Sequence, residues 1–222
     1  MQILSINSGK AATITVGQRV ATTGIFKLPI AGQVHVSTQG LVGDTVVDAV
    51  YHGGPDQAVY LYSAEDYAWW EAELQRPLPF GTFGENLTLS SFGPQPLRVG
   101  DRITINAVLL EVTFPRIPCS ILGARMNDAT FVQRFIQARR PGAYTRVLAT
   151  GDLQMNDRAT IEYAPASYPT LTELFDLWHG RERNPDLLRK GLNAPIAERP
   201  RAIFQQWLEQ GSMSSNVVAE ED

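Results

Sequence analysis

The chain has 222 residues, of which 44% are hydrophobic, enough to bury one domain of ordinary size and a small appendage. Its formal net charge of −4 gives no sign of a basic nucleic-acid-binding surface, and no apolar run is long enough to span a bilayer. The first residues lack the charged start and long apolar core of a signal peptide, so we expect a cytoplasmic protein.

Short strands dominate the first part of the chain. Runs of β-branched and aromatic residues, separated by Gly, Pro, Asn and Asp, predict strands at residues 2–6, 33–37, 57–62, 86–89, 102–106, 108–114, 143–150 and 158–163. So many short, largely hairpin-spaced strands indicate a closed or nearly closed antiparallel β-barrel. We therefore expect a mainly β domain over residues 1–165.

Two helices are predicted within this β domain. Ser63 can cap a helix that ends near Leu74, with an aromatic face directed at the core. Asp128 can cap a second helix, whose apolar stripe continues until Pro141 and Gly142.

A small helical domain is expected at residues 168–211. Thr170 and Glu173 form a capping box, Asn184 precedes Pro185 at the start of a second helix, and a third helix is expected from 195 to 210, ending before Gly211. Its acidic and basic residues balance, unlike those of a DNA-reading module. The polar, acidic residues 212–222 are predicted to form a flexible tail.

The single cysteine, Cys119, follows the predicted strand 108–114 in a segment stiffened by Pro115 and Pro118. One thiol excludes an internal disulfide and a self-contained iron–sulfur cluster. Arg116 is near enough in sequence to lower the thiol pKa, which would favour reactivity or binding of a soft metal. Inert packing of a buried cysteine remains the alternative at this point.

Three glycine-containing stretches precede the cysteine, at residues 40–44, 52–56 and 83–87. Each is compatible with an ordinary turn. Together they also suit close approach of the backbone to a ligand, and His52, Gly53 and Gly54 could form an anion-binding nest. Neighbouring ligands for zinc and the sequence surroundings of a papain-like cysteine are absent, and none of the three lysines has a convincing setting for pyridoxal phosphate.

These stretches, taken in order with residues 115–119, resemble the MOSC family, the domain named after the C-terminal part of molybdenum cofactor sulfurase. The resemblance is strongest to YiiM-type members, in which a three-helix domain follows. It implies a β-barrel that binds the molybdenum cofactor (molybdopterin), with Cys119 as the protein ligand to molybdenum. The positions that match the cofactor- or substrate-holding residues of the family are Lys10, His52, Gly53, Gly54, Asp56, Asn86 and Arg116.

The resemblance also implies an activity. Related proteins reduce N-hydroxylated compounds such as hydroxylamino bases and amidoximes, a detoxification reaction in which Cys119 and Arg116 would be the catalytic residues. No Gly-x-Gly-x-x-Gly stretch opens a dinucleotide-binding unit, so an external flavoprotein reductase is expected to supply electrons. The main alternative is a carrier of the cofactor, or of sulfur as a persulfide on Cys119. An interaction module acting through the helical appendage is a third hypothesis.

Overall fold

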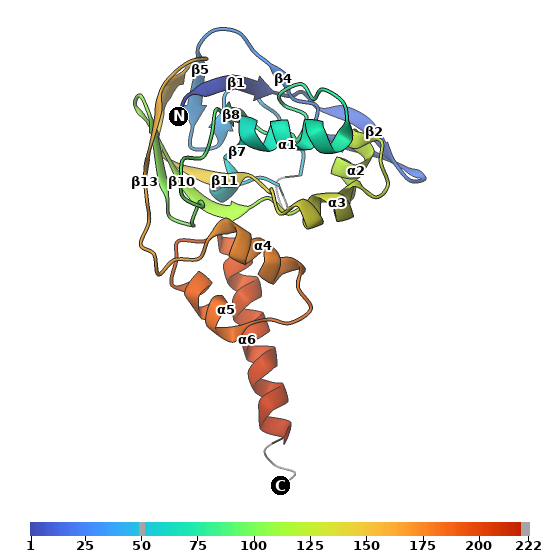
Figure 1. The fold of residues 1–222 in the computed structure, drawn as a ribbon, viewed down its shortest axis with the longest axis vertical. Helices are drawn as coiled ribbons and strands as arrows, with labels where there is room; N and C mark the ends of the chain where they lie inside the picture. The colour runs from blue at the N-terminus through green and yellow to red at the C-terminus, as the bar shows by residue number, and fades with distance from the viewer. Residues whose placement is uncertain (49–51, 219–222) are drawn as a thin grey trace.

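The computed structural model describes residues 1–48 and 52–218, and an eight-stranded sheet forms its centre (Figure 1). In spatial order the strands are β13 (Ala159–Glu162), β9 (Arg102–Ile105), β10 (Val108–Pro115), β11 (Ala143–Ala149), β7 (Val59–Ser63), β8 (Leu87–Leu89), β1 (Ile3–Ser8) and β4 (Leu28–Pro29). Each of the eight predicted strands corresponds to an observed strand, seven of them in this sheet. The β7–β8 pair is parallel, so the sheet is mixed rather than antiparallel throughout.

The prediction of a closed or nearly closed antiparallel barrel is confirmed only in part, because the sheet is mixed and does not close. Within the described residues the ladder runs from β13 to β4 without closing, and an isolated bridge between Gln2 and Arg158 with a few flanking backbone hydrogen bonds joins the β13 side to the start of β1. The reason lies in β1, since its last two residues pair with β4 and only its first residues face the turn before β13. The fold is therefore an open, strongly curved sheet with helices.

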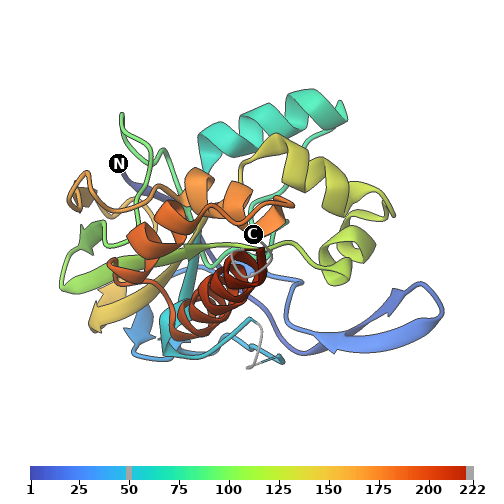
Figure 2. The same cartoon turned by 90° about the horizontal axis from the view of Figure 1, so that it is seen from below.

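Smaller sheets flank the central one. Strand β5 (Val34–Ser37) lies between β6 (Gly40–Leu41) and β12 (Gly151–Leu153). Among the residues that the structure describes, β2 (Ala12–Val16) pairs only with β3 (Arg19–Thr23). Figure 2 shows this β2–β3 hairpin extending beyond the rest of the chain. The sequence analysis missed it, although two runs rich in Thr and Val flank Gly17, whose φ of 61° suits a hairpin turn.

The predicted helices inside the β domain are present. Helix α1 (Ala64–Leu74) begins after Ser63, whose hydroxyl accepts the backbone N–H of Asp66. Its residue Trp70 is fully buried. Helix α3 (Phe131–Ala138) begins after Thr130 rather than at Asp128. The Asp128 carboxylate instead accepts hydrogen bonds from Thr130, and a further short helix, α2 (Ser120–Met126), precedes α3.

Three helices follow the sheet and lie below it in Figure 1: α4 (Leu171–His179), α5 (Pro185–Leu192) and α6 (Glu198–Val218). The capping box of Thr170 and Glu173 is present, and the side chain of Asn184 caps α5. Helix α6 does not end at Gly211, because a glycine inside a helix costs only about 1 kcal/mol and the surrounding residues continue the helix. Residues 212–218 of the predicted flexible tail continue α6, and residues 219–222 lie outside the described residues.

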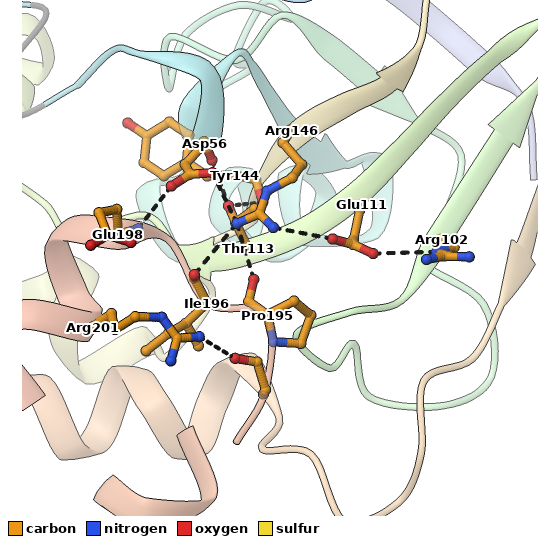
Figure 3. Close-up of polar contacts among 11 residues, drawn as sticks. Asp56, Arg102, Glu111, Thr113, Tyr144, Arg146, Pro195, Ile196, Glu198 and Arg201 are labelled. Carbon is orange, nitrogen blue, oxygen red and sulfur yellow. Dashed lines mark hydrogen bonds and ion pairs between the residues drawn. The ribbon is translucent and has the colours of Figure 1, made fainter. Parts of the chain in front are cut away.

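An arginine joins the sheet to these helices (Figure 3). The guanidinium of Arg146, on β11, contacts the carboxylates of Asp56 (2.9 Å) and Glu111 (3.3 Å). It also donates to the backbone carbonyls of Pro195 (3.1 Å) and Ile196 (3.4 Å), just before α6. The other carboxylate oxygen of Asp56 accepts the backbone N–H of Glu198 (2.8 Å), the first residue of α6. We call this group the Arg146 hub.

Replacing Arg146 with methionine should lower the free energy of unfolding by about 2 kcal/mol. The substitution removes the cation beside the Asp56 carboxylate, leaves Glu111 with its ion pair to Arg102, and removes both hydrogen bonds to the α6 junction. Urea unfolding measures the change, and limited proteolysis should cut the helical segment sooner. The control is Arg189→Met, which removes an exposed ion pair with Asp186 and should change the stability by less than about 0.5 kcal/mol. Equal effects of the two substitutions would contradict the stabilising role of the Arg146 hub.

Candidate active site

Cys119 lies where β10 leaves the sheet. Pro115 ends the strand, an irregular segment follows, and Cys119 is the extended residue (φ −129°) that precedes α2. Its carbonyl accepts the N–H of Leu122 (3.0 Å), which fixes the start of that helix. Cys119 forms no disulfide bond and is half-buried, so neighbouring residues partly enclose it.

Arg116 is buried close to the thiol. The residue is only 4% exposed, and its guanidinium lies over the rings of Tyr60 (5.5 Å) and Phe135 (5.8 Å). Its Nη1 is buried and finds no hydrogen-bond partner among the described residues. A buried cation without a carboxylate partner is expensive, so the site favours an anion.

Two neighbours change the acidity of the thiol. Burial raises the pKa of Cys119, but a hydrogen bond with His52 and the positive charge of Arg116 outweigh it and lower the pKa to about 6. The thiolate is therefore the main form at neutral pH. Cys119 has electrostatic surroundings that suit reactivity or metal binding, and its functional role stays a prediction.

Tyr144 connects these groups. Its hydroxyl lies 3.4 Å from Nδ1 of His52, and it also hydrogen-bonds Arg116. Burial raises the pKa of Tyr144, while the charge of Arg116 opposes the rise. Tyr144 was not predicted, since it belongs to β11 and meets Cys119 only in the folded sheet.

A second polar group surrounds Asp44. The Asp44 carboxylate forms an ion pair with buried Lys27 and accepts hydrogen bonds from the side chain of Asn86 (2.8 Å) and the backbone N–H of Gly9 (2.8 Å). Burial lowers the pKa of Lys27, although the Asp44 charge counteracts this. The side-chain amide oxygen of Asn86 accepts the backbone N–H of Tyr60, and this bond holds the side-chain amide in one orientation. Sequence reasoning missed Lys27, and Asp44 in the first glycine stretch was the only signal of this pair.

Both groups line one cavity of about 670 Å³. Its lining contains four predicted site residues: Cys119, Arg116, His52 and Asn86. It also contains Lys27, Tyr144 and parts of the β2–β3 hairpin, which sequence reasoning did not assign to the site. The volume is within the usual range for small-molecule and cofactor sites.

The other predicted site residues are placed elsewhere. The described lining of the cavity does not include Lys10, Gly53, Gly54 or Asp56. The Lys10 ammonium is exposed and donates to the carbonyl of Gly43 (3.0 Å), while Asp56 belongs to the Arg146 hub. Gly54, with φ 85°, precedes a short 3₁₀ helix, η1 (Pro55–Gln57). A direct role of these four in holding a ligand stays a prediction.

Comparison with known proteins identifies the family. The model of the MOSC domain matches residues 48–160, about half of the chain. This chain belongs to the MOSC family. YflK of Bacillus subtilis, an uncharacterized protein, is 37% identical over 149 residues, covering 67% of this chain and 67% of YflK. A protein named "Reductase" from Gibberella moniliformis is 33% identical over 172 residues, which cover 75% of this chain but only 30% of that protein.

A solved structure of a YiiM protein has the same fold. The crystal structure of YiiM from Geobacillus stearothermophilus superposes with a TM-score of 0.77 at 27% identity, covering 93% of this chain and 98% of that one. The similarity thus includes the C-terminal helices as well as the sheet. Within the described residues, no helix is long and apolar enough to cross a membrane.

The alkylation rate of Cys119 should follow a titration with a midpoint near pH 6, the pKa of about 6 given by its surroundings. Because the thiolate is the nucleophile, the rate should rise as pH increases through that value and level off by neutral pH. Iodoacetamide labelling of the cofactor-free protein, followed by mass spectrometry, measures it. In His52→Ala the midpoint should move upward, since a group that lowers the pKa is lost. An unchanged midpoint in this variant would rule out the His52 contact as a cause.

Proposed function

We propose that this protein is a molybdenum-cofactor-dependent oxidoreductase that reduces N-hydroxylated compounds, with Cys119 as the protein ligand to molybdenum. One observation carries the proposal: a half-buried thiol of pKa about 6 lies at a cavity of about 670 Å³ beside a buried, incompletely paired arginine. The match to the MOSC domain, a domain associated with molybdenum cofactor binding, supports the cofactor. The relative named "Reductase" supports an oxidoreductase role.

The residues of the cavity fit that cofactor. A thiolate is a soft ligand suited to molybdenum, and it needs no further protein ligand when sulfur and oxygen atoms of the cofactor fill the other positions. The cofactor also carries phosphate, and Arg116 puts a positive charge without a carboxylate partner among the described residues into the cavity of a chain whose net charge is −4, whereas the charge of Lys27 is paired with Asp44. The orphaned Nη1 of Arg116 provides a donor for an anionic oxygen.

Each side chain of the site has a separate role in this proposal. Cys119 presents its sulfur from a stiff segment, and Arg116 holds a fixed positive charge against the ring of Tyr60. His52, hydrogen-bonded to the thiol and near Tyr144, orients the sulfur. Asn86, with its amide fixed by Tyr60 and Asp44, offers a rigid polar wall. When bound, the molybdenum cofactor would supply two-electron chemistry at the N–O bond, in which two electrons and two protons convert N–OH to N–H and water.

Electrons come from a partner in this proposal, a flavoprotein reductase, as the family resemblance implies. Such a donor must reach the cavity from outside, and the rim offers apolar surface, because Val20, Val46 and Val47 are 71%, 45% and 41% exposed. A thiol of low pKa would also suit a persulfide carrier, so the first experiment below separates the two functions.

Cys119→Ser should abolish molybdenum retention and N-hydroxyl reduction while changing the stability by only roughly 1 kcal/mol. Hydroxyl is a harder ligand and, unlike the thiol, is not ionised at neutral pH. Elemental analysis of protein made in a cofactor-producing host gives the metal content, and reduced viologen with benzamidoxime gives turnover. Ser120→Ala, an exposed neighbour that also lines the cavity, is the control and should keep both. Cyanide-labile sulfur without bound molybdenum in the wild type would instead identify the carrier function.

Arg116→Lys should weaken cofactor retention although the charge is kept. Lysine lacks the planar fork and cannot lie over Tyr60 while also presenting a second donor to an anion. The loss, which we expect to be about tenfold in cofactor affinity, can be measured by the molybdenum content after gel filtration at increasing dilution. Equal content in the two proteins would show that only the charge of Arg116 matters.

A further inference from the structure

The helical segment forms part of the cavity wall. Trp178 of α4 and Arg199 and Pro200 of α6 line the same cavity as Cys119 and Arg116. The site is therefore shared between the sheet and helices α4 and α6, and Figure 1 shows these helices below the sheet. A substrate that enters this cavity meets side chains from both parts.

Trp178 is the rigid aromatic part of that wall. Its indole packs edge-on against Phe114 (ring centroids 5.5 Å, 75°) and lies tilted against Trp207 (5.6 Å, 55°). Phe114, which directly precedes Pro115, lines the cavity too, and it contacts Phe204 of α6. Trp178 stays half-buried and borders the open space. An aromatic side chain held from two sides offers contact area at little cost in conformational entropy.

The Arg146 hub fixes the distance between this wall and the thiol. Asp56 accepts the N–H of Glu198, which immediately precedes Arg199 and Pro200. Arg146 donates to the two carbonyls just before α6 while it is itself held on β11 by Glu111. Helix α6 cannot shift away from the sheet without breaking these bonds.

We propose that Trp178 is a specificity-determining residue that packs against the planar ring of an aromatic N-hydroxylated substrate and so favours it over aliphatic compounds with the same N–OH group. This inference rests on the proposed function. The physical basis is that the π face of a fixed indole attracts a planar ring, whereas a small aliphatic group gains little from it. The polar side of the cavity, with Arg116 and Asn86, remains for the cofactor and the N–OH group.

The experiment compares benzamidoxime with acetamidoxime, which carry the same reducible group on a ring and on a methyl group. The dissociation constant of each is measured by calorimetry on the cofactor-loaded protein without an electron donor, and KM and kcat are then measured with reduced viologen. Trp178→Leu keeps apolar volume but removes the π face. It should weaken benzamidoxime binding and raise its KM about tenfold, with kcat nearly unchanged. The constants for acetamidoxime should change by less than about twofold.

Two further variants complete the design. Trp178→Phe should restore most of the benzamidoxime affinity, because it returns an aromatic face. Trp69→Ala removes an exposed tryptophan of α1 that the described lining of the cavity does not include, and it should leave both affinities unchanged. Equal losses for both amidoximes in Trp178→Leu, or no measurable binding of benzamidoxime to the wild type, would overturn the role of Trp178. Ring-dependent binding without reduction of either compound would overturn the proposed function alone.

Discussion

The buried guanidinium of Arg116 is the constraint on which the site depends. The chain places this cation against two aromatic rings, a tyrosine hydroxyl and a thiol, and the described residues provide no carboxylate to pair with it. Burying a charge in this way is costly unless an anion compensates for it. The thiolate of Cys119 supplies part of that compensation, and the lowered pKa of the thiol is the other side of the same interaction. Arginine and thiol therefore cannot be understood separately.

A second arginine performs the complementary task. Arg146 is satisfied almost entirely by protein groups, with two carboxylates and two backbone carbonyls around it, although its Nε is buried without a partner among the described residues. Arg116 thus prepares the cavity for a ligand, while Arg146 holds the helical segment that forms the cavity wall. The two residues lie on neighbouring segments, the end of β10 and the middle of β11, so the same pair of strands carries both functions.

Local patterns were the part of the structure that the sequence predicted well. The caps at Ser63 and Thr170 and the eight strand runs depend on residues close together in the chain, and all are present. The closed barrel failed because closure depends on how β1 divides its edge between β4 and β13, which no local pattern encodes. Asp56 shows the same limit at the site, since its carboxylate binds a backbone N–H that is 142 positions away. Lys27 escaped prediction because its pairing with Asp44 forms only in the fold.

The position of the thiol pKa has a consequence for metal binding. A metal takes up the thiolate, so binding to an ordinary cysteine of pKa about 8.5 at neutral pH must also displace a proton. In this site His52 and Arg116 already favour the thiolate. The free energy of deprotonation is supplied when the chain folds and brings the segments around residues 52 and 116 together. In the proposed function, folding rather than metal binding would therefore supply the free energy that deprotonates Cys119. The open sheet with its attached helices brings these distant groups to one thiol, at a cavity of about 670 Å³.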